Sequence, residues 1–291
     1  MKGIILCAFG ARGYGFTAVN LAMTIKKHSP DIPIHLVCEK KTMDQIPHDY
    51  MQWFDIVEYC ERNVDEPGAQ KWIWMMQSDF EWTLFLDVDA ICIGDITPWM
   101  DALIEKMEST GTHISTQCMG VGKLGDDGIS YDLWMDHSNV EKYFGYKPGT
   151  PWITTQTSWV LFDNSIDAIR FNAGVVARMN FVHISQLKNR WGKFIPDELG
   201  VSLTIPQLMD SFCPHTSDDF IFFGNTYKEL NEIKSKYKII SMYGNGGGNS
   251  LVKPYIFEFI DRYLIEQYRS HNLNHIFKTH YIMTDKMLSQ R

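Results

Sequence analysis

Runs of apolar residues alternate with stretches of helical periodicity over the first hundred positions, and this alternation limits the fold more than any other feature. Residues 3–9 form an uninterrupted apolar run that ends at Gly10 in a glycine-rich loop. Such a run is typical of a strand that is buried on both faces, as in a parallel sheet. Helical spacing follows over residues 17–28, and a second apolar run covers 34–38. We therefore expect the chain to begin with a right-handed strand–helix–strand unit.

The rest of the chain continues as an α/β pattern, with its most apolar strand at residues 82–86. Residues 119–150 are rich in glycine and poor in aliphatic side chains, which predicts a long excursion around a site. No internal repeat or low-complexity linker occurs, so we expect one domain over residues 1–253 and a helical extension over 254–291. Further strands are expected at 54–59, 113–117, 159–163, 219–223 and 238–242, and helices at 70–79, 100–108, 165–176, 202–211, 226–237 and 254–270.

Composition and charge exclude several classes of protein. With 291 residues, 45% of them hydrophobic and 21% charged, the chain can bury a core without disulfides or structural metal. Its net charge of −8 argues against a broad nucleic-acid or membrane surface, though not against a local basic patch. The six cysteines form no C-x-x-C pair, and the first residues contain no apolar stretch long enough for a signal peptide or a membrane span. We therefore expect a reduced, cytoplasmic setting and no membrane partner.

Two aspartates end the most apolar strand. Asp87 and Asp89 follow residues 82–86, and alternation along an extended chain would place both carboxylates on one face. Two acids where water is scarce need a counter-charge, and a hard divalent cation that also binds a diphosphate is the simplest source of it. The structural alternative is that Asp87 caps the following loop and Asp89 is solvated.

The residues around these aspartates resemble a known family. Residues 71–96, KWIWMMQSDFEWTLFLDVDAICIGDI, are similar to the segment of metal-dependent glycosyltransferases of the GT-A fold in which an apolar strand delivers a D-x-D motif. Residues 14–39, YGFTAVNLAMTIKKHSPDIPIHLVCE, are similar to the first helix and second strand of that family. The resemblance extends over residues 1–255 and implies an α/β, Rossmann-like GT-A fold. It also implies transfer of a sugar from a nucleotide diphospho-sugar, with a UDP-sugar as the expected donor.

The resemblance implies roles for individual residues. Asp87 and Asp89 would serve as metal and ribose ligands, the metal being Mn²⁺ or Mg²⁺. Lys71 would approach the diphosphate, and Asp95 matches a second acidic position of the family. The nucleotide itself would be contacted by Ala8, Phe9, Gly10 and Tyr14.

A late glycine-rich loop shows the same resemblance with one departure. Residues 241–255, SMYGNGGGNSLVKPY, are similar to the family's loop in which a histidine usually completes the metal shell and a lysine contacts phosphate. Lys253 stands at the lysine position, but no histidine is present, so Asn245, Asn249 or water would have to replace it. Backbone amides around Gly246 can also approach phosphate oxygens, whereas a flexible lead-in to the next helix is the structural alternative.

Acidic pairs elsewhere are candidates for the acceptor side of the reaction. Asp197 and Glu198 follow a proline and open a predicted helix, and Asp219 precedes a predicted strand. One of these carboxylates could act as the general base toward an acceptor hydroxyl. Compensation of the helix dipole would also explain Asp197 and Glu198, and capping would explain Asp219. The sequence leaves this choice open.

Other functions fit the pattern less well. A dinucleotide-dependent oxidoreductase would show G-x-G-x-x-G, but the loop after the first strand reads G-x-x-G-x-G. An enzyme that synthesises nucleotide sugars would carry a basic, glycine-rich signature in that loop, and only Arg12 is available there. A catalytically inactive module that binds nucleotide sugars is the non-enzymatic alternative.

The sequence does not identify the acceptor hydroxyl. A glycan or a protein fits an acidic chain, and a hydroxymethylated DNA base is the alternative because basic residues gather in two places. Residues 262–291 carry five lysines and arginines against two acids, and Lys188, Arg190 and Lys193 surround Trp191. A solvated helix face with a charged tail is the structural explanation of the same residues.

Overall fold

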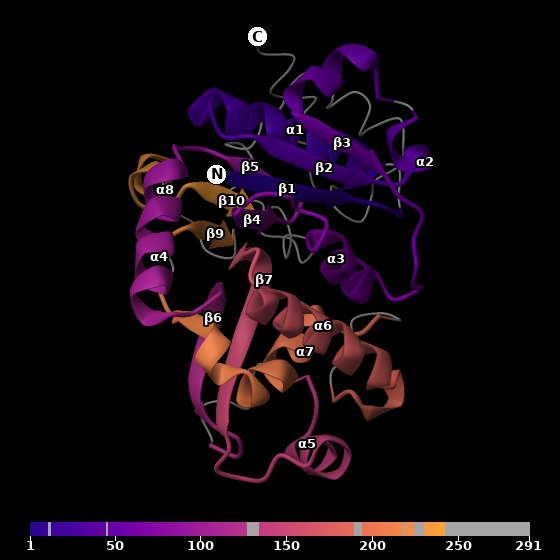
Figure 1. Ribbon diagram of the computed structural model, residues 1–291, viewed down its shortest axis with the longest axis vertical. Coiled ribbons are helices and arrows are strands. Elements are labelled where there is room, and N and C mark those ends of the chain that lie inside the picture. The colour runs from indigo at the N-terminus through magenta and orange to yellow at the C-terminus, as the bar shows by residue number, and fades with distance from the viewer. Residues whose placement is uncertain are drawn as a thin grey trace. The chain divides into compact units, whose positions relative to one another are not determined.

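The structure, a computed structural model, describes residues 1–10, 13–44, 46–126, 134–188, 194–217, 219–223 and 230–241. Its strands, all but β8 labelled in Figure 1, are β1 (Lys2–Ala8), β2 (Ile34–Cys38), β3 (Ile56–Tyr59), β4 (Trp82–Leu86), β5 (Ala90–Cys92), β6 (Ile114–Lys123), β7 (Pro151–Asp163), β8 (Phe212–His215), β9 (Ile221–Phe223) and β10 (Ile239–Ser241). Its helices are α1 (Gly13–His28), α2 (Lys40–Met43), α3 (Pro67–Met75), α4 (Thr97–Thr110), α5 (His137–Phe144), α6 (Ile166–Phe181), α7 (Asp197–Thr204) and α8 (Leu230–Lys236). Short 3₁₀ helices cover His48–Trp53, Ile184–Gln186, Ile205–Gln207 and Met209–Ser211.

Within the described residues, seven strands form one sheet in the order β3-β2-β1-β4-β7-β6-β8, and β5, β10 and β9 form a second sheet. β2 runs parallel to β3 and β6 runs parallel to β8, whereas β6 and β7 are antiparallel. Every residue of β2 and of β4 is buried, as expected for strands covered on both faces. These two strands have the bounds predicted from their apolar runs, and the α/β class is confirmed.

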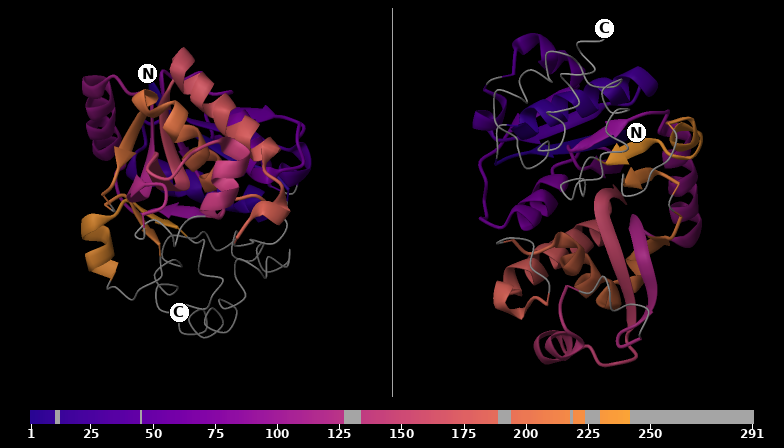
Figure 2. Two further views of the ribbon diagram at one scale, coloured as in Figure 1. Left: turned by 90° about the horizontal axis from the view of Figure 1, so that it is seen from below. Right: turned by 180° about the vertical axis from the view of Figure 1, so that it is seen from behind.

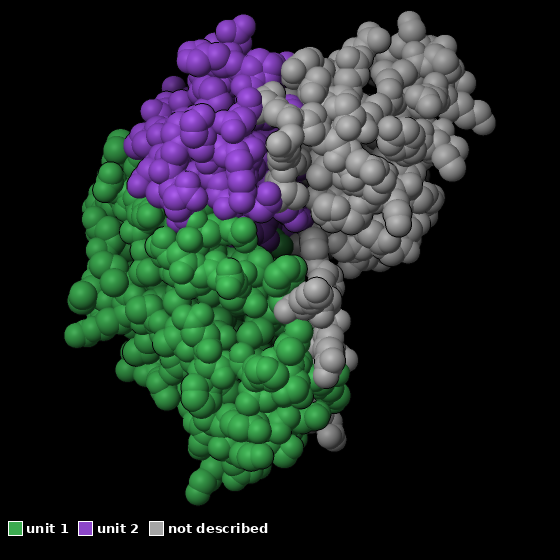
Figure 3. Space-filling model, turned by 90° about the vertical axis from the view of Figure 1, so that its right-hand side faces the viewer, with its two compact units in different colours: residues 1–5, 62–85, 101–217 green, residues 6–61, 86–100, 218–291 purple. Residues whose placement is uncertain are grey.

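The described part of the chain divides into two compact units, coloured separately in Figure 3. One unit contains the described residues within 6–61, 86–100 and 219–241. In it, α1 packs against the small sheet, where Thr24 Oγ1 accepts a hydrogen bond of 3.1 Å from the backbone N–H of Cys92. The rings of Trp99 and Phe220 stack with centroids 3.6 Å apart. These contacts anchor the residues that follow β4 to the rest of this unit.

The other unit contains residues 1–5, 62–85 and 101–217. Its main feature is the long hairpin of β6 and β7, with α5 beside the far end of the hairpin (Figures 1 and 2). The core there combines residues of β7, α5 and α7 with residues of the connecting segments, namely Leu124, Met135, Val140, Trp152, Val182, Leu187, Leu199 and Leu203. Burial of each large apolar side chain contributes roughly 1.5–3 kcal/mol, so this cluster stabilises the end of the hairpin.

The hairpin corrects the predicted irregular excursion over residues 119–150. β6 continues to Lys123 and β7 begins at Pro151, although strands were expected only at 113–117 and 159–163. Their antiparallel ladder includes Gly120 opposite Thr154, and β6 carries register shifts of the kind that β-bulges produce. A glycine-rich segment has little local preference for a strand, and here its backbone groups form their hydrogen bonds by pairing with β7. A helix, α5, also forms within this region.

Other predicted bounds shift by a few residues. The helix expected at 202–211 begins earlier, at Asp197, and passes into 3₁₀ turns, and β8 was not anticipated. The helix expected at 254–270, the loop around Gly246 and the boundary between residues 253 and 254 lie outside the described residues. No helix in the described ranges is long and apolar enough to cross a membrane. The six cysteines all fall within those ranges, and none of them forms a disulfide there.

Candidate active site

The carboxyl ends of β1 and β4 form the place where an open α/β sheet binds ligands. In the sheet, β1 lies between β2 and β4, so the strand order reverses its direction at β1. Ligands of such sheets bind outside the carboxyl ends of the strands at this reversal. Ala8 ends β1, and Asp87 follows β4 directly. Both strand ends belong to the unit that contains residues 6–61 and 86–100.

The chain between β4 and β5 is Asp87, Val88 and Asp89, and its exposure alternates. Val88 is 7% exposed, whereas the aspartates on either side of it are half-buried. The chain bends at Val88 and Asp89, so Val88 turns to the core while both aspartates keep part of their surface accessible.

Tyr14, in the first turn of α1, lies within the electrostatic field of these carboxylates. Burial raises the pKa of its phenol, as do the charge of Asp89 and then that of Asp87, from 10.0 to about 12. Both aspartates therefore lie close enough to act on the same hydroxyl. The phenol is neutral at physiological pH and can donate a hydrogen bond.

The residues at the end of β1 pass from the core to the surface. Ala8 is buried, Phe9 is half-buried and Gly10 is exposed. Gly10 has a φ of +83°, a conformation that other residues rarely adopt. Its backbone N–H donates a hydrogen bond of 2.7 Å to Oε2 of Glu39, which follows β2. Gly10, one of the residues assigned to the nucleotide, is thus connected to the neighbouring strand end, a contact that the sequence did not suggest.

The donor set at this site suits a hard cation in part. Asp87 and Asp89 offer carboxylate oxygens, the ligands that Mg²⁺ and Mn²⁺ prefer. Over the ranges that the structure describes, no group of three or more His, Cys, Asp and Glu residues could hold a metal ion. A cation here would therefore take two protein carboxylates and fill its other positions with phosphate oxygens and water, as Mg²⁺ commonly does. The two aspartates fit such a cation, and Asn249 lies outside the described residues.

The small sheet separates Asp219 from this pair. β5 pairs antiparallel with β10, and Ala90 and Ser241 are in register at the end next to Asp89. β9 runs parallel to β10, so Asp219, which comes before β9, lies at the opposite end of this sheet. The structure therefore does not bring Asp219 together with the D-x-D aspartates.

Lys71 and Asp197 form a largely buried ion pair in the other unit. The Lys71 ammonium is 2.7 Å from Asp197 Oδ2, and their side chains are only 12% and 15% exposed. The same oxygen accepts hydrogen bonds from Thr157 Oγ1 at 2.8 Å and from Trp72 Nε1 at 3.2 Å. Lys71 also donates to the Thr157 carbonyl at 3.2 Å and lies 5.0 Å from the centre of the Phe85 ring. Two residues that were assigned to the donor and the acceptor side therefore contact each other.

Glu198 and Asp197 occupy the first turn of α7, as the sequence predicted. Glu198 is half-buried, and its backbone carbonyl accepts a hydrogen bond of 3.4 Å from Thr155 Oγ1. Acidic side chains in a first turn interact favourably with the helix dipole, so the structural explanation also applies here. Thr157, a partner of Asp197, was missed because nothing in its local sequence distinguishes it from other strand threonines.

Two further residues, Asp95 and Trp152, have contacts that serve the fold. Asp95 accepts hydrogen bonds from Ser29 Oγ at 2.7 Å and from the backbone N–H of Thr97 at 3.0 Å, and so caps the start of α4. Trp152 is fully buried in the core, so its ring cannot stack on a sugar or a base.

Comparison with solved structures shows the fold class. The chain is similar to the galactosyltransferase LgtC in complex with donor and acceptor sugar analogs, with a TM-score of 0.54 and 12% identity over 93% of this chain and 100% of that one. An active-site mutant of LgtC matches with a TM-score of 0.52 and 11% identity over the same shares. No family model matches the sequence, and no curated protein matches it. The chain has the GT-A fold.

Proposed function

We propose that this protein is a glycosyltransferase that moves a sugar from a nucleotide diphospho-sugar to a hydroxyl group. One observation carries the proposal: two partly accessible aspartates follow β4, beside the end of β1, where the strand order of a GT-A sheet reverses. The similarity of this chain to LgtC concerns the fold, and LgtC itself was solved with donor and acceptor sugar analogs. A UDP-sugar is the donor that we expect.

The residues of the donor site have separable tasks in this proposal. Asp87 and Asp89 would hold Mn²⁺ or Mg²⁺, and Asp87 would also lie near the ribose. Bound there, the cation would neutralise charge on the departing diphosphate. Ala8, Phe9 and Gly10 would contact the nucleotide through the end of β1, together with Tyr14. The neutral phenol of Tyr14 would donate a hydrogen bond without adding charge to a site that already contains two acids.

The late glycine-rich segment follows Ser241 closely enough in the sequence to reach the proposed donor site. Ser241 is in register with Ala90, the residue after Asp89, and residue 246 follows Ser241 by five positions. Since an extended chain spans about 3.3–3.6 Å per residue, this connection can return to the aspartates. We propose that Gly246 and Lys253 contact phosphate and that Asn249 or water replaces the absent histidine as a metal ligand.

The roles proposed for the other unit rest on the family resemblance and on the contacts of Lys71. Asp197 Oδ2 accepts from three donors, which orients the ammonium of Lys71. We therefore assign Lys71 to the diphosphate, Asp197 to the orientation of Lys71, and Glu198 to the acceptor side. Asp219 was the third candidate general base, and its place across the small sheet from Asp89 gives that role no support.

The acceptor that we expect is a hydroxyl of a glycan or a protein, with a hydroxymethylated DNA base as the alternative. Lys188, in the basic cluster considered for DNA, has its ammonium 3.7 Å from Asp136 Oδ1, so part of that charge is compensated. A nucleotide-sugar-synthesising enzyme would release pyrophosphate from a nucleoside triphosphate. An inactive binding module would bind UDP with Mn²⁺ and release no sugar from any UDP-sugar.

The test is a screen of UDP-sugars with Mn²⁺, for hydrolysis and for thermal stabilisation, on the wild type and two variants. Asp87→Asn and Asp89→Asn are expected to reduce turnover at least about a hundredfold, because loss of a metal ligand removes several kcal/mol of charge stabilisation. Each amide has nearly the shape of the carboxylate, so circular dichroism and the melting temperature without ligand should match the wild type.

Asp101→Asn is the matched control, because Asp101 forms an exposed ion pair with Lys2 and lies outside the proposed site. It should retain wild-type turnover and wild-type stabilisation by UDP and Mn²⁺. Turnover that survives a chelator, or near wild-type turnover in either D-x-D variant, would contradict the metal-dependent reaction.

A further inference from the structure

A buried acid at the end of β2 has no part in the reaction proposed above. Glu39 follows β2 directly, and only 4% of its surface is exposed. It occupies the N-cap position of α2, yet its side chain makes no capping hydrogen bond to that helix. A carboxylate that is buried to this extent needs hydrogen-bond donors or a positive charge as partners.

Those partners connect Glu39 to the end of β1. Its Oε2 accepts the 2.7 Å hydrogen bond from the Gly10 N–H, and its own backbone N–H donates to the Ala8 carbonyl at 3.1 Å. On the other side, Oε1 lies 3.2 Å from the ammonium of Lys41, whose side chain is 59% exposed. The carboxylate thus joins a surface lysine to the backbone of a residue that we assign to the nucleotide.

Gly10 is held in a conformation that needs such a contact. Its φ of +83° is left-handed, and nothing lies within 4 Å of the position that a Cβ would take. Glycine loses more conformational freedom on ordering than any other residue, so a contact that holds its backbone has a large effect. The hydrogen bond to Glu39 is a charge-assisted one, which is about twice as strong as a neutral hydrogen bond.

The same segment of chain also supports the start of α1. A Cβ on Gly15 would clash with the backbone carbonyl oxygen of Thr42 in α2, so the first turn of α1 packs directly on α2. Gly10 before the helix and Gly15 inside it are therefore both in contact with residues 39–42. Tyr14 lies between these two glycines in the sequence.

We propose that Glu39 is a positioning residue that holds the end of β1 in the conformation that binds the nucleoside of the donor. The proposal rests on the function proposed above and adds to it a residue that touches neither the metal nor the phosphates. Without the carboxylate, Gly10 would sample other conformations, and the nucleotide would have to select the competent one. Apparent affinity falls by the fraction of molecules in that competent state.

Calorimetric titration with UMP and with UDP, in the presence of Mn²⁺, tests this role. If about one molecule in ten of Glu39→Ala keeps the competent conformation, the Kd for both nucleotides rises about tenfold. The increase should be the same for UMP and UDP, because Gly10 lies at the nucleoside end. Glu39→Gln should fall within about threefold of the wild type, because the amide oxygen still accepts from Gly10. With a UDP-sugar that the wild type turns over, KM should rise with Kd while kcat changes little.

Gly10→Ala provides a second variant, because alanine disfavours the positive φ and turns the amide away from Glu39. In the double variant the two effects should be less than additive, since both act through one hydrogen bond. Asp44→Ala is the control: Asp44 is an exposed acid five positions from Glu39 and pairs with Lys40 at 3.0 Å. It should leave both Kd values unchanged.

The measurements separate the positioning role of Glu39 from the proposed glycosyltransferase function. Wild-type Kd values in Glu39→Ala, a fall in kcat at constant KM, or fully additive effects with Gly10→Ala would overturn the positioning role while the glycosyltransferase proposal stands. A wild type that binds neither UMP nor UDP would overturn the proposed function and this inference with it. Should Glu39→Ala fail to fold, Gly10→Ala and Glu39→Gln still give the comparison.

Discussion

Tyr14 shows how one residue reports on the two aspartates of the candidate site. Its phenol is buried, and the charges of Asp89 and Asp87 both oppose its ionisation, so its pKa is about 12 instead of 10.0. The folded state therefore holds the phenolic proton more tightly than the unfolded state does. This contribution to stability is therefore complete below pH 10 and is lost as the pH rises through about 12.

Asp89→Asn is expected to lower the pKa of Tyr14 from about 12 toward 10.0 without reaching it, because burial is the larger cause. The measurement is tyrosinate absorbance against pH, with the Tyr14→Phe variant subtracted to isolate this residue. Asp31→Asn, which removes an exposed acid from the same unit, should leave the titration unchanged. An unaltered Tyr14 titration in Asp89→Asn would show that the carboxylate does not face the phenol.

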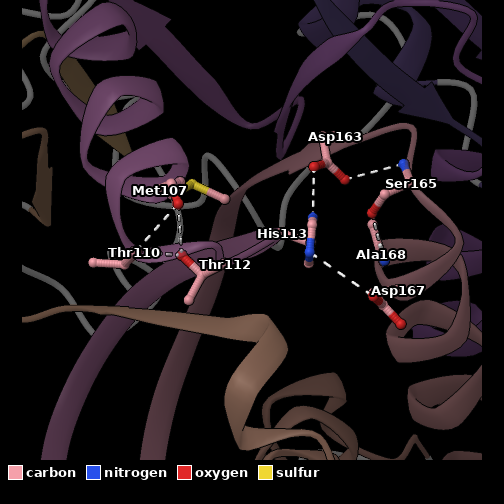
Figure 4. A network of polar contacts seen from close by, with 8 residues as sticks. All are labelled: Met107, Thr110, Thr112, His113, Asp163, Ser165, Asp167 and Ala168. Atoms are coloured by element: carbon pink, nitrogen blue, oxygen red, sulfur yellow. Dashed lines mark hydrogen bonds and ion pairs between the residues drawn. The ribbon is translucent and has the colours of Figure 1, made fainter.

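At the scale of elements, the start of α6 is fixed by a group of residues that we name the His113 clamp: His113, Asp163 and Asp167 (Figure 4). The His113 ring has Nδ1 at 2.8 Å from Asp163 Oδ2 and Nε2 at 3.8 Å from Asp167 Oδ2. Asp163 also accepts from the N–H of Ser165, whose Oγ caps the helix by accepting from the Ala168 N–H. The clamp thus connects the start of β6, the end of β7 and the first turn of α6.

His113→Ala is expected to lower the free energy of unfolding by about 1 kcal/mol, since a charge-assisted hydrogen bond is lost at a half-exposed site. The melting temperature should fall by about 2–4 °C for a protein of this size. Arg170→Ala is the control, because Arg170 contacts the same Asp167 at 3.3 Å but is 66% exposed, and its change should be smaller. Equal melting temperatures for the wild type and His113→Ala would show that the clamp does not stabilise α6.

At the scale of the whole molecule, the distribution of charge restricts which kind of acceptor can bind. The chain has a net charge of −8, and Lys188 lies near Asp136. Phosphate contacts dominate the affinity of proteins for DNA, so a DNA acceptor needs several cations that are not compensated by acids. This charge distribution favours a glycan or a protein hydroxyl.

We therefore expect a labelled duplex with hydroxymethylated pyrimidines to bind weakly and with little dependence on salt. A DNA acceptor held by about four phosphate contacts would instead lose about two orders of magnitude in affinity between 50 and 200 mM salt. Titration at both salt concentrations separates the two cases. Tight binding that weakens in this way, and weakens further in Lys188→Ala, would contradict the expected acceptor.

The α/β class, the strands at 34–38 and 82–86 and the pair of aspartates after the second of these strands could be predicted from the sequence. Each of these features depends on neighbouring residues: an apolar run commits a segment to a buried strand, and the two aspartates come directly after such a run. The likeness to LgtC agrees with that class at the level of the fold. Metal ligation and the tasks of individual residues stay predictions.

Only the tertiary structure decided which distant residues meet. The hairpin of β6 and β7, the ion pair of Lys71 with Asp197 and the hydrogen bond from Gly10 to Glu39 join segments that have no local pattern in common. Strand order and register create these contacts, and both depend on how the whole chain buries its apolar surface. The sequence by itself therefore determined what each segment becomes, and the packing of the segments determined which of their polar groups are neighbours, because hydrophobic periodicity is local whereas pairing is not.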